Sequence, residues 1–157
     1  MFCSIADNRI FRVKEEMSES KHSLAVFLCH AHNDREAVHK LYDRLLRVGI
    51  HAWLDVERLQ PGQDWEREIR KAILKSNVVI VCLSRGFNKR RGYRHEELKI
   101  AWEKAKLLSN DEIFIIPVRL EKCEMPESLK HLQRVDLFDV GGYKKLIRAL
   151  REFARAK

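Results

Sequence analysis

The sequence lacks long apolar runs, and it contains little glycine, proline or cysteine. No stretch of its 157 residues approaches the roughly 20 apolar residues that a transmembrane helix needs, so we expect no membrane span. Residues 1–10 include Asp7, Asn8 and Arg9 where a secretion signal needs an apolar segment, so we also expect no such signal. Six glycines and three prolines exclude a collagen-like or low-complexity chain. The four cysteines form no C-x-x-C pair, which favours a protein of the reducing cytoplasm.

Motifs for phosphate or metal binding are absent too. Neither a G-x-G-x-x-G nor a G-x-x-x-x-G-K-[ST] sequence occurs, which excludes the glycine loops that hold phosphates in many nucleotide-binding proteins. His30 and His32 lie two residues apart, but no further ligands accompany them at a metal-binding spacing. We therefore expect no bound metal.

The basic residues, in contrast, are abundant and unevenly placed. They number 31 against 23 acidic residues, which gives a net charge of +8. Residues 85–94 and 144–157 carry the excess, and the rest of the chain is close to neutral. Such segments fit a partner that bears phosphate, or they only keep the surface solvated. Because we find no exposed aromatic residues interleaved with the second segment, we do not expect nucleic acid as the main partner.

From residue 23 onward, short apolar runs alternate with helical periodicity. The runs of strand length are Leu24–Cys29, His51–Leu54, Asn77–Leu83, Glu112–Val118 and Arg134–Phe138. Apolar residues at helical spacing occupy Asp34–Val48, the segment after Asp64, Leu98–Ala105 and Tyr143–Phe153. Five strands joined by helices predict one α/β domain over residues 23–157, with an open parallel sheet and helices on both faces. Residues 1–22 are predicted to be a flexible N-terminal tail, in which Met17 is an alternative start.

The ends of the first helices carry recognisable signals. Asn33 is a candidate N-cap for the first helix and Gly49 a candidate stop. Asp64 is a candidate N-cap for the second helix, immediately after the Pro61-Gly62 pair. These signals predict where the loops of the domain begin and end.

Ligands of doubly wound sheets bind outside the carboxyl ends of the strands, where the strand order reverses. For a sheet of order 2-1-3-4-5, the loops His30–Asn33 and Ser84–Gly92 flank that point. A third loop, Asp55–Gln63, is long for a strand-to-helix connection. Its apolar Leu59 either contacts another molecule or folds back on its own domain.

Several ordered motifs resemble the Toll/interleukin-1 receptor (TIR) domain, and its prokaryotic type more than the animal adaptors. VFLCHAHNDR (residues 26–35) resembles the opening strand and loop of that family. Residues 53–84 include the Leu-x-Pro-Gly sequence of the family's BB loop and a strand that ends in serine. GYRHEELKIAWEKA (residues 92–105) resembles the helix that bears the family's catalytic glutamate. Residues 116–129 and 135–150 resemble the end of prokaryotic members.

The resemblance implies a flavodoxin-like fold with the strand order 2-1-3-4-5, and cleavage of NAD+ between nicotinamide and ribose. The catalytic residue would be Glu97, four positions after the aromatic Tyr93 and directly before Leu98. We expect Glu97 in the first turn of its helix, where the helix dipole favours an ionised carboxylate. The residues expected to bind NAD+ are His30, Ala31, Asn33, Asp55, Ser84, Arg85 and Tyr93, with Arg85 on the pyrophosphate.

By the same resemblance, NAD+ is the substrate and no cofactor is needed. The products would be nicotinamide and either ADP-ribose or a cyclic isomer of it. Leu59, Pro61 and Gly62 would form the loop through which chains self-associate, under the control of an activating partner or upstream sensor. A cytoplasmic role in prokaryotic defence is expected. The alternative is a non-catalytic TIR scaffold in which Glu97 is only a surface acid.

Overall fold

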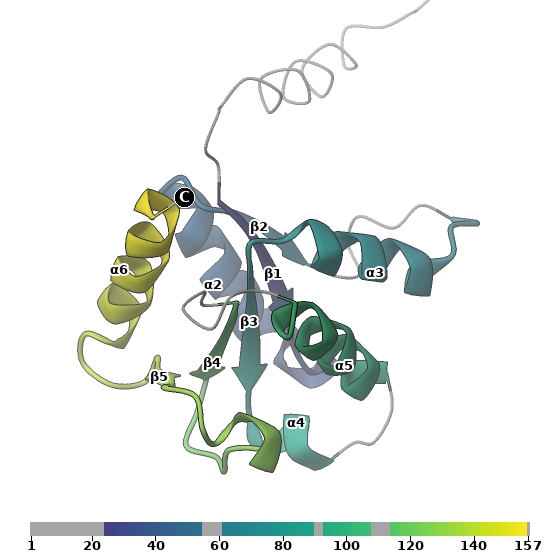
Figure 1. Cartoon of the computed structure of the whole chain (residues 1–157). Helices are drawn as coiled ribbons and strands as arrows, with labels where there is room; N and C mark the ends of the chain where they lie inside the picture. Colours follow the sequence, from purple (N-terminus) through teal and green to yellow (C-terminus); the bar gives the residue numbers. More distant parts are fainter. Residues whose placement is uncertain (1–23, 55–60, 90–92, 108–113, 157) are drawn as a thin grey trace, which may run out of the picture.

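One parallel sheet forms the centre of the molecule. The computed structural model describes residues 24–54, 61–89, 93–107 and 114–156. The strands lie in the order β2-β1-β3-β4-β5, and every neighbouring pair is parallel (Figure 1). Their bounds are Ala25–Cys29 (β1), His51–Leu54 (β2), Val78–Leu83 (β3), Ile115–Arg119 (β4) and Val135–Asp136 (β5). The predicted flavodoxin-like sheet and its strand order are confirmed.

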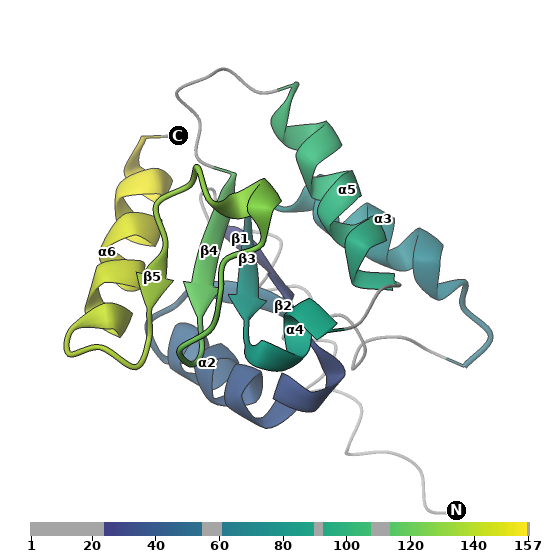
Figure 2. The same ribbon diagram turned by 90° about the horizontal axis from the view of Figure 1, so that it is seen from below.

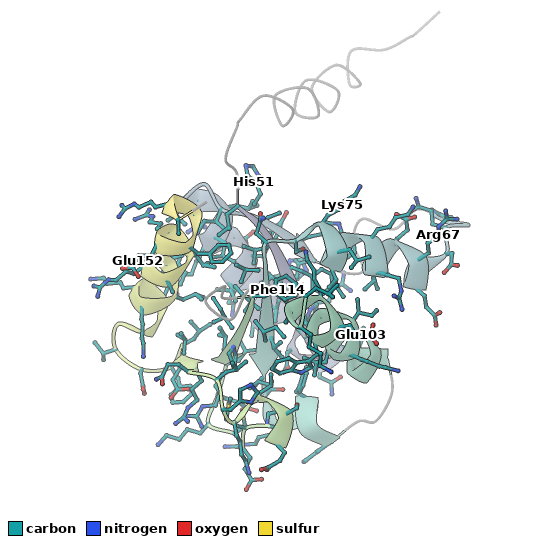
Figure 3. The ribbon with its side chains drawn as sticks, in the orientation of Figure 1. His51, Arg67, Lys75, Glu103, Phe114 and Glu152 are labelled. Atoms are coloured by element: carbon teal, nitrogen blue, oxygen red, sulfur yellow. The ribbon has the colours of Figure 1, made fainter. Side chains whose placement is uncertain are left out.

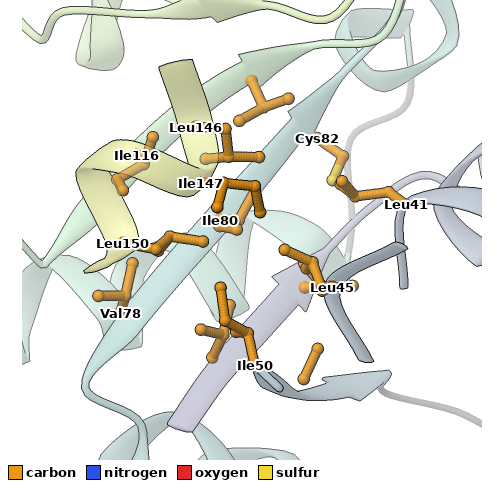
Figure 4. Packing of buried hydrophobic residues seen from close by; sticks show 14 of the residues in the cluster. Leu41, Leu45, Ile50, Val78, Ile80, Cys82, Ile116, Leu146, Ile147 and Leu150 are labelled. Atoms are coloured by element: carbon orange, nitrogen blue, oxygen red, sulfur yellow. The ribbon is translucent and has the colours of Figure 1, made fainter. Parts of the chain in front are cut away.

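Helices cover both faces of this sheet because its strands are apolar on both sides. All six residues of β3 are buried, and they alternate between two hydrophobic clusters. One cluster lies under α2 (Arg35–Arg47) and α6 (Gly142–Arg155), and Figure 4 shows Leu45 and Leu150 of these helices against Val78 and Ile80. The other lies under α3 (Trp65–Lys75) and α5 (Tyr93–Ala105), on the opposite face (Figure 2).

The helix signals are confirmed at two of three positions. The Asp64 side chain caps α3 by accepting a hydrogen bond of 3.3 Å from the Arg67 N–H. Gly49 follows the end of α2 with a φ of 79°, a backbone conformation that favours glycine. Asn33, however, is not the N-cap of α2, because it lies within a 3-10 turn (η1, His32–Asp34) and α2 begins only at Arg35. Asp34 takes the N-cap position, and its side chain makes no capping hydrogen bond.

Other segments differ from the prediction in length or type. The expected loop Ser84–Gly92 contains a short helix, α4 (Arg85–Lys89). The connection from β4 to β5 contains a 3-10 turn (η2, Glu127–Leu129). β5 has two residues, because the chain turns back at Asp136, whose carbonyl oxygen accepts a hydrogen bond of 3.2 Å from the Asp139 N–H. The predicted tail, residues 1–22, lies outside the described residues.

Within the part of the chain that the structure describes, no helix has the length and apolar character to cross a membrane.

A charged pair fastens the short edge strand β5 to β4. Arg119 and Asp136 lie directly opposite each other in the register of the sheet. The guanidinium donates two hydrogen bonds of 2.6 Å to the two carboxylate oxygens, and a third of 2.8 Å to the Cys123 carbonyl. The hydrogen bonds from Arg119 lower the pKa of Asp136 and raise that of Arg119 itself. Both side chains are only 15% exposed, so solvent screens the pair weakly.

We predict that Asp136→Asn lowers the free energy of unfolding by about 1–3 kcal/mol at pH 7, since a charge-assisted pair is lost. Because folding lowers the pKa of Asp136, the pair stabilises the fold above the unfolded pKa of about 3.9. That contribution disappears as pH falls through the folded pKa. Urea unfolding between pH 7 and pH 2 therefore finds that the stabilities of the variant and the wild type converge in acid.

Glu127→Gln, which removes an exposed pair with Lys130, serves as the control and changes stability by less than about 0.5 kcal/mol. Equal effects of the two substitutions at pH 7 would contradict this account.

Candidate functional site

The candidate site lies where β1 and β3, neighbours in the sheet, come to their carboxyl ends. β1 ends at Cys29 and β3 at Leu83, and the two strands stand in register from Val26 to Cys29. The strand order reverses here, since β2 lies on the other side of β1. Figure 2 views this end of the sheet and shows α4 beside the end of β3. The loops after the two strands therefore lie next to each other, as predicted.

A hydrogen-bond network joins the two loops. Ser84, only 2% exposed, directs its hydroxyl proton to the Oδ2 atom of Asp34. The same hydroxyl oxygen accepts a hydrogen bond of 3.1 Å from the Phe87 N–H, in the first turn of α4. Asp34, at the N-cap position of α2, therefore bonds to Ser84 instead of capping the helix. The predicted site included Ser84 but missed Asp34.

His30 and Ala31 follow β1 directly, and both side chains are buried. His30 is 8% exposed, and its Nδ1 atom lies 3.5 Å from the Leu28 carbonyl oxygen. Ala31 packs in the hydrophobic cluster under α3 and α5, and its carbonyl oxygen accepts a hydrogen bond of 2.9 Å from the Asp34 N–H. Contact between Ala31 and a substrate would thus be limited to its backbone. Asn33, in contrast, is exposed.

Asn33 lines a pocket of about 470 Å³ at this edge, together with Asp34, Glu36, Lys40, Leu137 and Phe138. The pocket lies between α2 and the end of β5, on the α2 side of the sheet. Lys40 and Glu36, one turn apart on α2, form an ion pair of 3.0 Å along its wall. Because α5 covers the other face, this pocket and Glu97 belong to opposite sides of the sheet.

Arg85 turns toward the connection between β4 and β5. Its backbone N–H donates a hydrogen bond of 2.9 Å to Glu121, and its side-chain Nε donates one of 3.3 Å to the Lys122 carbonyl. A guanidinium has five N–H donors, so the rest of this exposed group is left for another acceptor. The carboxylate of Glu121 nonetheless adds a negative charge beside the place where a pyrophosphate was expected.

The cysteines at this end behave as core residues. Cys29 and Cys82 are buried in the two hydrophobic clusters. Burial, and to a lesser degree the charge of Asp34, raises the pKa of Cys82 far above its usual range, so this thiol stays protonated. Within the described residues, no group of three or more histidine, cysteine or acidic side chains is arranged to hold a metal.

Glu97 and Tyr93 belong to α5, which packs on the second face of the sheet. Tyr93 is the first residue of the helix and Glu97 the fifth. Glu97 therefore begins the second turn, and the expectation of a first-turn position is wrong. The helix dipole acts on it less strongly there, because the effect falls off within one turn. Their side chains lie outside the described residues.

The register of α5 nevertheless agrees with the predicted stripe. Leu98 and Ala101 are buried, and Trp102 and Ala105 pack against the same cluster. Trp102 also stacks on His131, with 5.4 Å between the ring centroids. Leu98 belongs to the buried side of α5, so the Glu97 backbone, one residue before it, lies next to that side. Figure 1 shows the first turns of α5 toward the end of the sheet where β1 and β3 finish.

The predicted assembly loop is described only at its end. Asp55 and Leu59 lie outside the described residues. Pro61 and Gly62 form an exposed turn, in which Gly62 has a φ of 87° and no atom within 4 Å of where a Cβ would stand. The turn leads into α3 at the right-hand edge of the molecule in Figure 1. It faces solvent, as a loop that contacts other molecules must.

Comparisons with known proteins agree with this architecture. The chain belongs to the TIR domain family, whose model matches residues 26–151. It is similar to the NAD(+) hydrolase TcpA of Theionarchaea archaeon, with 40% identity over 63 residues, which are 40% of this chain and 19% of that protein. It is also similar to the NAD(+) hydrolase TcpC of Escherichia coli, with 34% identity over 71 residues, which are 45% of this chain and 23% of that protein. The chain thus spans about a fifth of the length of these relatives.

Among solved structures, the TIR domain of the Toll-related receptor TRR-2 from Hydra magnipapillata is similar to this chain. The TM-score is 0.67 at 29% sequence identity, and the match covers 80% of this chain and 97% of that one. The fold is therefore that of TIR domains.

We predict that Ser84→Ala lowers the free energy of unfolding by about 1–3 kcal/mol, because it removes the buried hydroxyl that binds the Asp34 carboxylate. The Phe87 N–H keeps its hydrogen bond of 3.2 Å to the Ser84 carbonyl oxygen. Ser128→Ala, at an exposed serine, changes it by less than about 0.5 kcal/mol. Urea unfolding at pH 7 measures both. Equal stability of the two variants would mean that the hydroxyl of Ser84 does not join the loops.

Proposed function

We propose that this chain cleaves NAD+ at the bond between nicotinamide and ribose, with Glu97 as the catalytic residue. The proposal is carried by one observation above all: a member of the TIR domain family has a glutamate at the edge of the buried stripe of α5. Two similar proteins named NAD(+) hydrolase support it. The crevice between the ends of β1 and β3, where doubly wound sheets bind ligands, supports it as well.

The chemistry requires little more than a fixed carboxylate. Nicotinamide leaves NAD+ as a neutral molecule and takes the electron pair of the glycosidic bond, so no acid has to protonate it. The ribose carbon becomes positively charged, and the Glu97 carboxylate stabilises that charge or binds the ribose hydroxyls. Water then attacks the same carbon and loses a proton, which gives ADP-ribose. Attack by an atom of the ADP-ribose itself gives a cyclic isomer. Neither route uses a cofactor.

The residues around the crevice divide into supports and contacts. Ser84 and Asp34 support the loops through their hydrogen bond. His30, Asn33 and Arg85 are the proposed contacts with the dinucleotide, and Tyr93 the proposed contact with nicotinamide or ribose. Asp55 remains a proposed contact as well.

We further propose that activity depends on self-association through the loop that contains Leu59, Pro61 and Gly62. The crevice carries the carboxylates of Asp34 and Glu121, and the Nε of Arg85 is bound to a carbonyl. In a single chain, Arg85 therefore has less capacity left for the pyrophosphate of a dinucleotide. A neighbouring copy would complete the site. An activating partner and a cytoplasmic role in prokaryotic defence are parts of the same proposal.

We predict that Glu97→Gln lowers nicotinamide release at least about 10²–10³-fold, the usual loss when a group that stabilises transition-state charge is removed. The measurement is chromatography of NAD+ incubated with concentrated protein. Glu103→Gln, on the exposed side of the same helix (Figure 3), retains wild-type activity. Full activity of a folded Glu97→Gln variant would contradict the site. No activity in wild-type protein that light scattering shows to be assembled would favour the non-catalytic scaffold.

We predict that Gly62→Ala shifts the dependence of activity on protein concentration to higher concentration. Gly49→Ala is the matched control, because both glycines have a positive φ and open space around the position of a Cβ. Each substitution strains the backbone by about 1–2 kcal/mol, so stability alone cannot separate them. Only Gly62 lies in the proposed assembly loop. Identical activity curves for the two variants would remove this loop from the proposal.

A further inference from the structure

A row of basic side chains runs along one side of α6. Lys144, Arg148, Arg151 and Arg155 follow each other at intervals of four, three and four residues, and all four are exposed. At 1.5 Å of rise per residue, the row is about 16 Å long, with about 4.5–6 Å between neighbours. The sequence alone showed these residues only as part of a basic segment, without placing them on one side of a helix. The helix aligns them.

The row borders a groove where α6 meets the end of α2. All four residues line it, and its volume is about 350 Å³. Val48, the residue after α2, and the partly buried Tyr143 line it too. The groove is therefore built from two elements that are nearly 100 residues apart in the sequence.

A fifth cation, Arg44 of α2, contacts Tyr143, which lines the groove. The Arg44 guanidinium lies over the Tyr143 ring, 3.5 Å from its centroid. The Tyr143 hydroxyl donates a hydrogen bond of 2.8 Å to the Arg44 carbonyl oxygen, which fixes the ring. A planar guanidinium stacked on an aromatic ring offers a surface on which a nucleic-acid base can stack.

Little negative charge offsets these cations. Glu152 is the acidic residue that lines the groove, and Figure 3 shows it on α6. Among the described residues, no ion pair involves any of the four cations of the row. The first turn of α6 contains Lys144 and Lys145 and no acid, although the positive end of a helix dipole disfavours cations there. Lys144 and the N-terminal end of the helix dipole therefore both contribute positive charge where α6 begins.

We propose that this groove binds single-stranded nucleic acid through its phosphates, without sequence preference. Four cations in a line, beside a concave surface with a stacking group, match the way in which proteins track a single strand. The stacking surface of Arg44 and Tyr143 needs an unpaired base, so a single strand fits the groove better than a duplex. The expectation against nucleic acid rested on a lack of interleaved aromatics, and the fold supplies Tyr143 and Arg44 together.

An anionic membrane fits this surface less well. The apolar side of α6, with Leu146 and Leu150, is fully buried against the sheet and cannot enter a bilayer. The basic row lines a groove, whereas a membrane presents a broad surface. This inference does not depend on NAD+ cleavage, and the test below reads binding alone.

The test is a titration of the full chain with a fluorescein-labelled oligothymidylate of about twelve nucleotides, followed by fluorescence anisotropy at several salt concentrations. Four phosphate contacts predict that log K falls against log [salt] with a slope of about −2.8. Arg148→Gln with Arg151→Gln should halve that slope and weaken binding about 25-fold at 0.1 M salt. Both residues are exposed, so the double variant is expected to fold, which circular dichroism checks.

The matched control removes two charges on the other face of the sheet. Arg70→Gln with Lys75→Gln, on exposed positions of α3, should leave the affinity and the slope unchanged (Figure 3 labels Lys75). Equal weakening by both double variants would overturn the proposal, because net charge alone would then explain binding. Tighter binding to phosphatidylserine vesicles, to a DNA duplex or to polyglutamate than to the single strand would overturn it as well.

Discussion

The burial of β3 on both faces is the constraint on which the candidate site depends. β3 lies between β1 and β4, and helices cover both of its sides, so its last residue, Leu83, is fully buried. The residue that follows it, Ser84, is therefore still below the surface and is buried as well. A buried hydroxyl needs a hydrogen-bond partner. Asp34 supplies it, and the need to satisfy one polar group thereby fixes the loop after β1 against the loop after β3.

In this arrangement, the residues that hold the loops in place and the proposed catalytic residue come from different elements. The residues closest to the ends of β1 and β3 are buried, hydrogen-bonded or both, and they fix the two loops against each other. Glu97 belongs to α5, a separate element. Leu98 and Ala101 hold that helix in place by packing into the hydrophobic cluster on the second face of the sheet. Because Glu97 belongs to α5 and not to a strand, this proposed catalytic residue can be substituted without disturbing the sheet.

Much of the fold was predictable because β-branched and apolar runs need cover on both faces, and Asn77–Leu83 is such a run. The N-cap of α3 was predictable because the Asp64 side chain bonds to Arg67, only three residues further along the chain. The N-cap prediction failed at Asn33 because residues 32–34 form a 3-10 turn and α2 begins only at Arg35. Asp34, which takes the N-cap position, bonds instead to Ser84, 50 residues away in the sequence. The helix α4 was missed since Gly86 and Asn88 are weak helix formers in a five-residue segment.

The location of the site was predictable from the sequence, whereas the contacts between its residues were not. Glu97 and Tyr93 came from the family resemblance, whereas the turn of the helix in which Glu97 lies required the start of α5. The groove on α6 could not be foreseen, because its Arg44–Tyr143 contact joins residues 99 positions apart. Only the folded chain brings the end of α2 against α6.

The most direct measurement is mass spectrometry of the products after concentrated, assembled protein has been incubated with NAD+ in ¹⁸O-labelled water. The account predicts free nicotinamide together with ADP-ribose that carries one ¹⁸O atom on the ribose carbon, or an unlabelled cyclic isomer. Either companion product shows that the nicotinamide–ribose bond was broken. Recovery of intact NAD+ from protein that light scattering shows to be assembled would contradict the account.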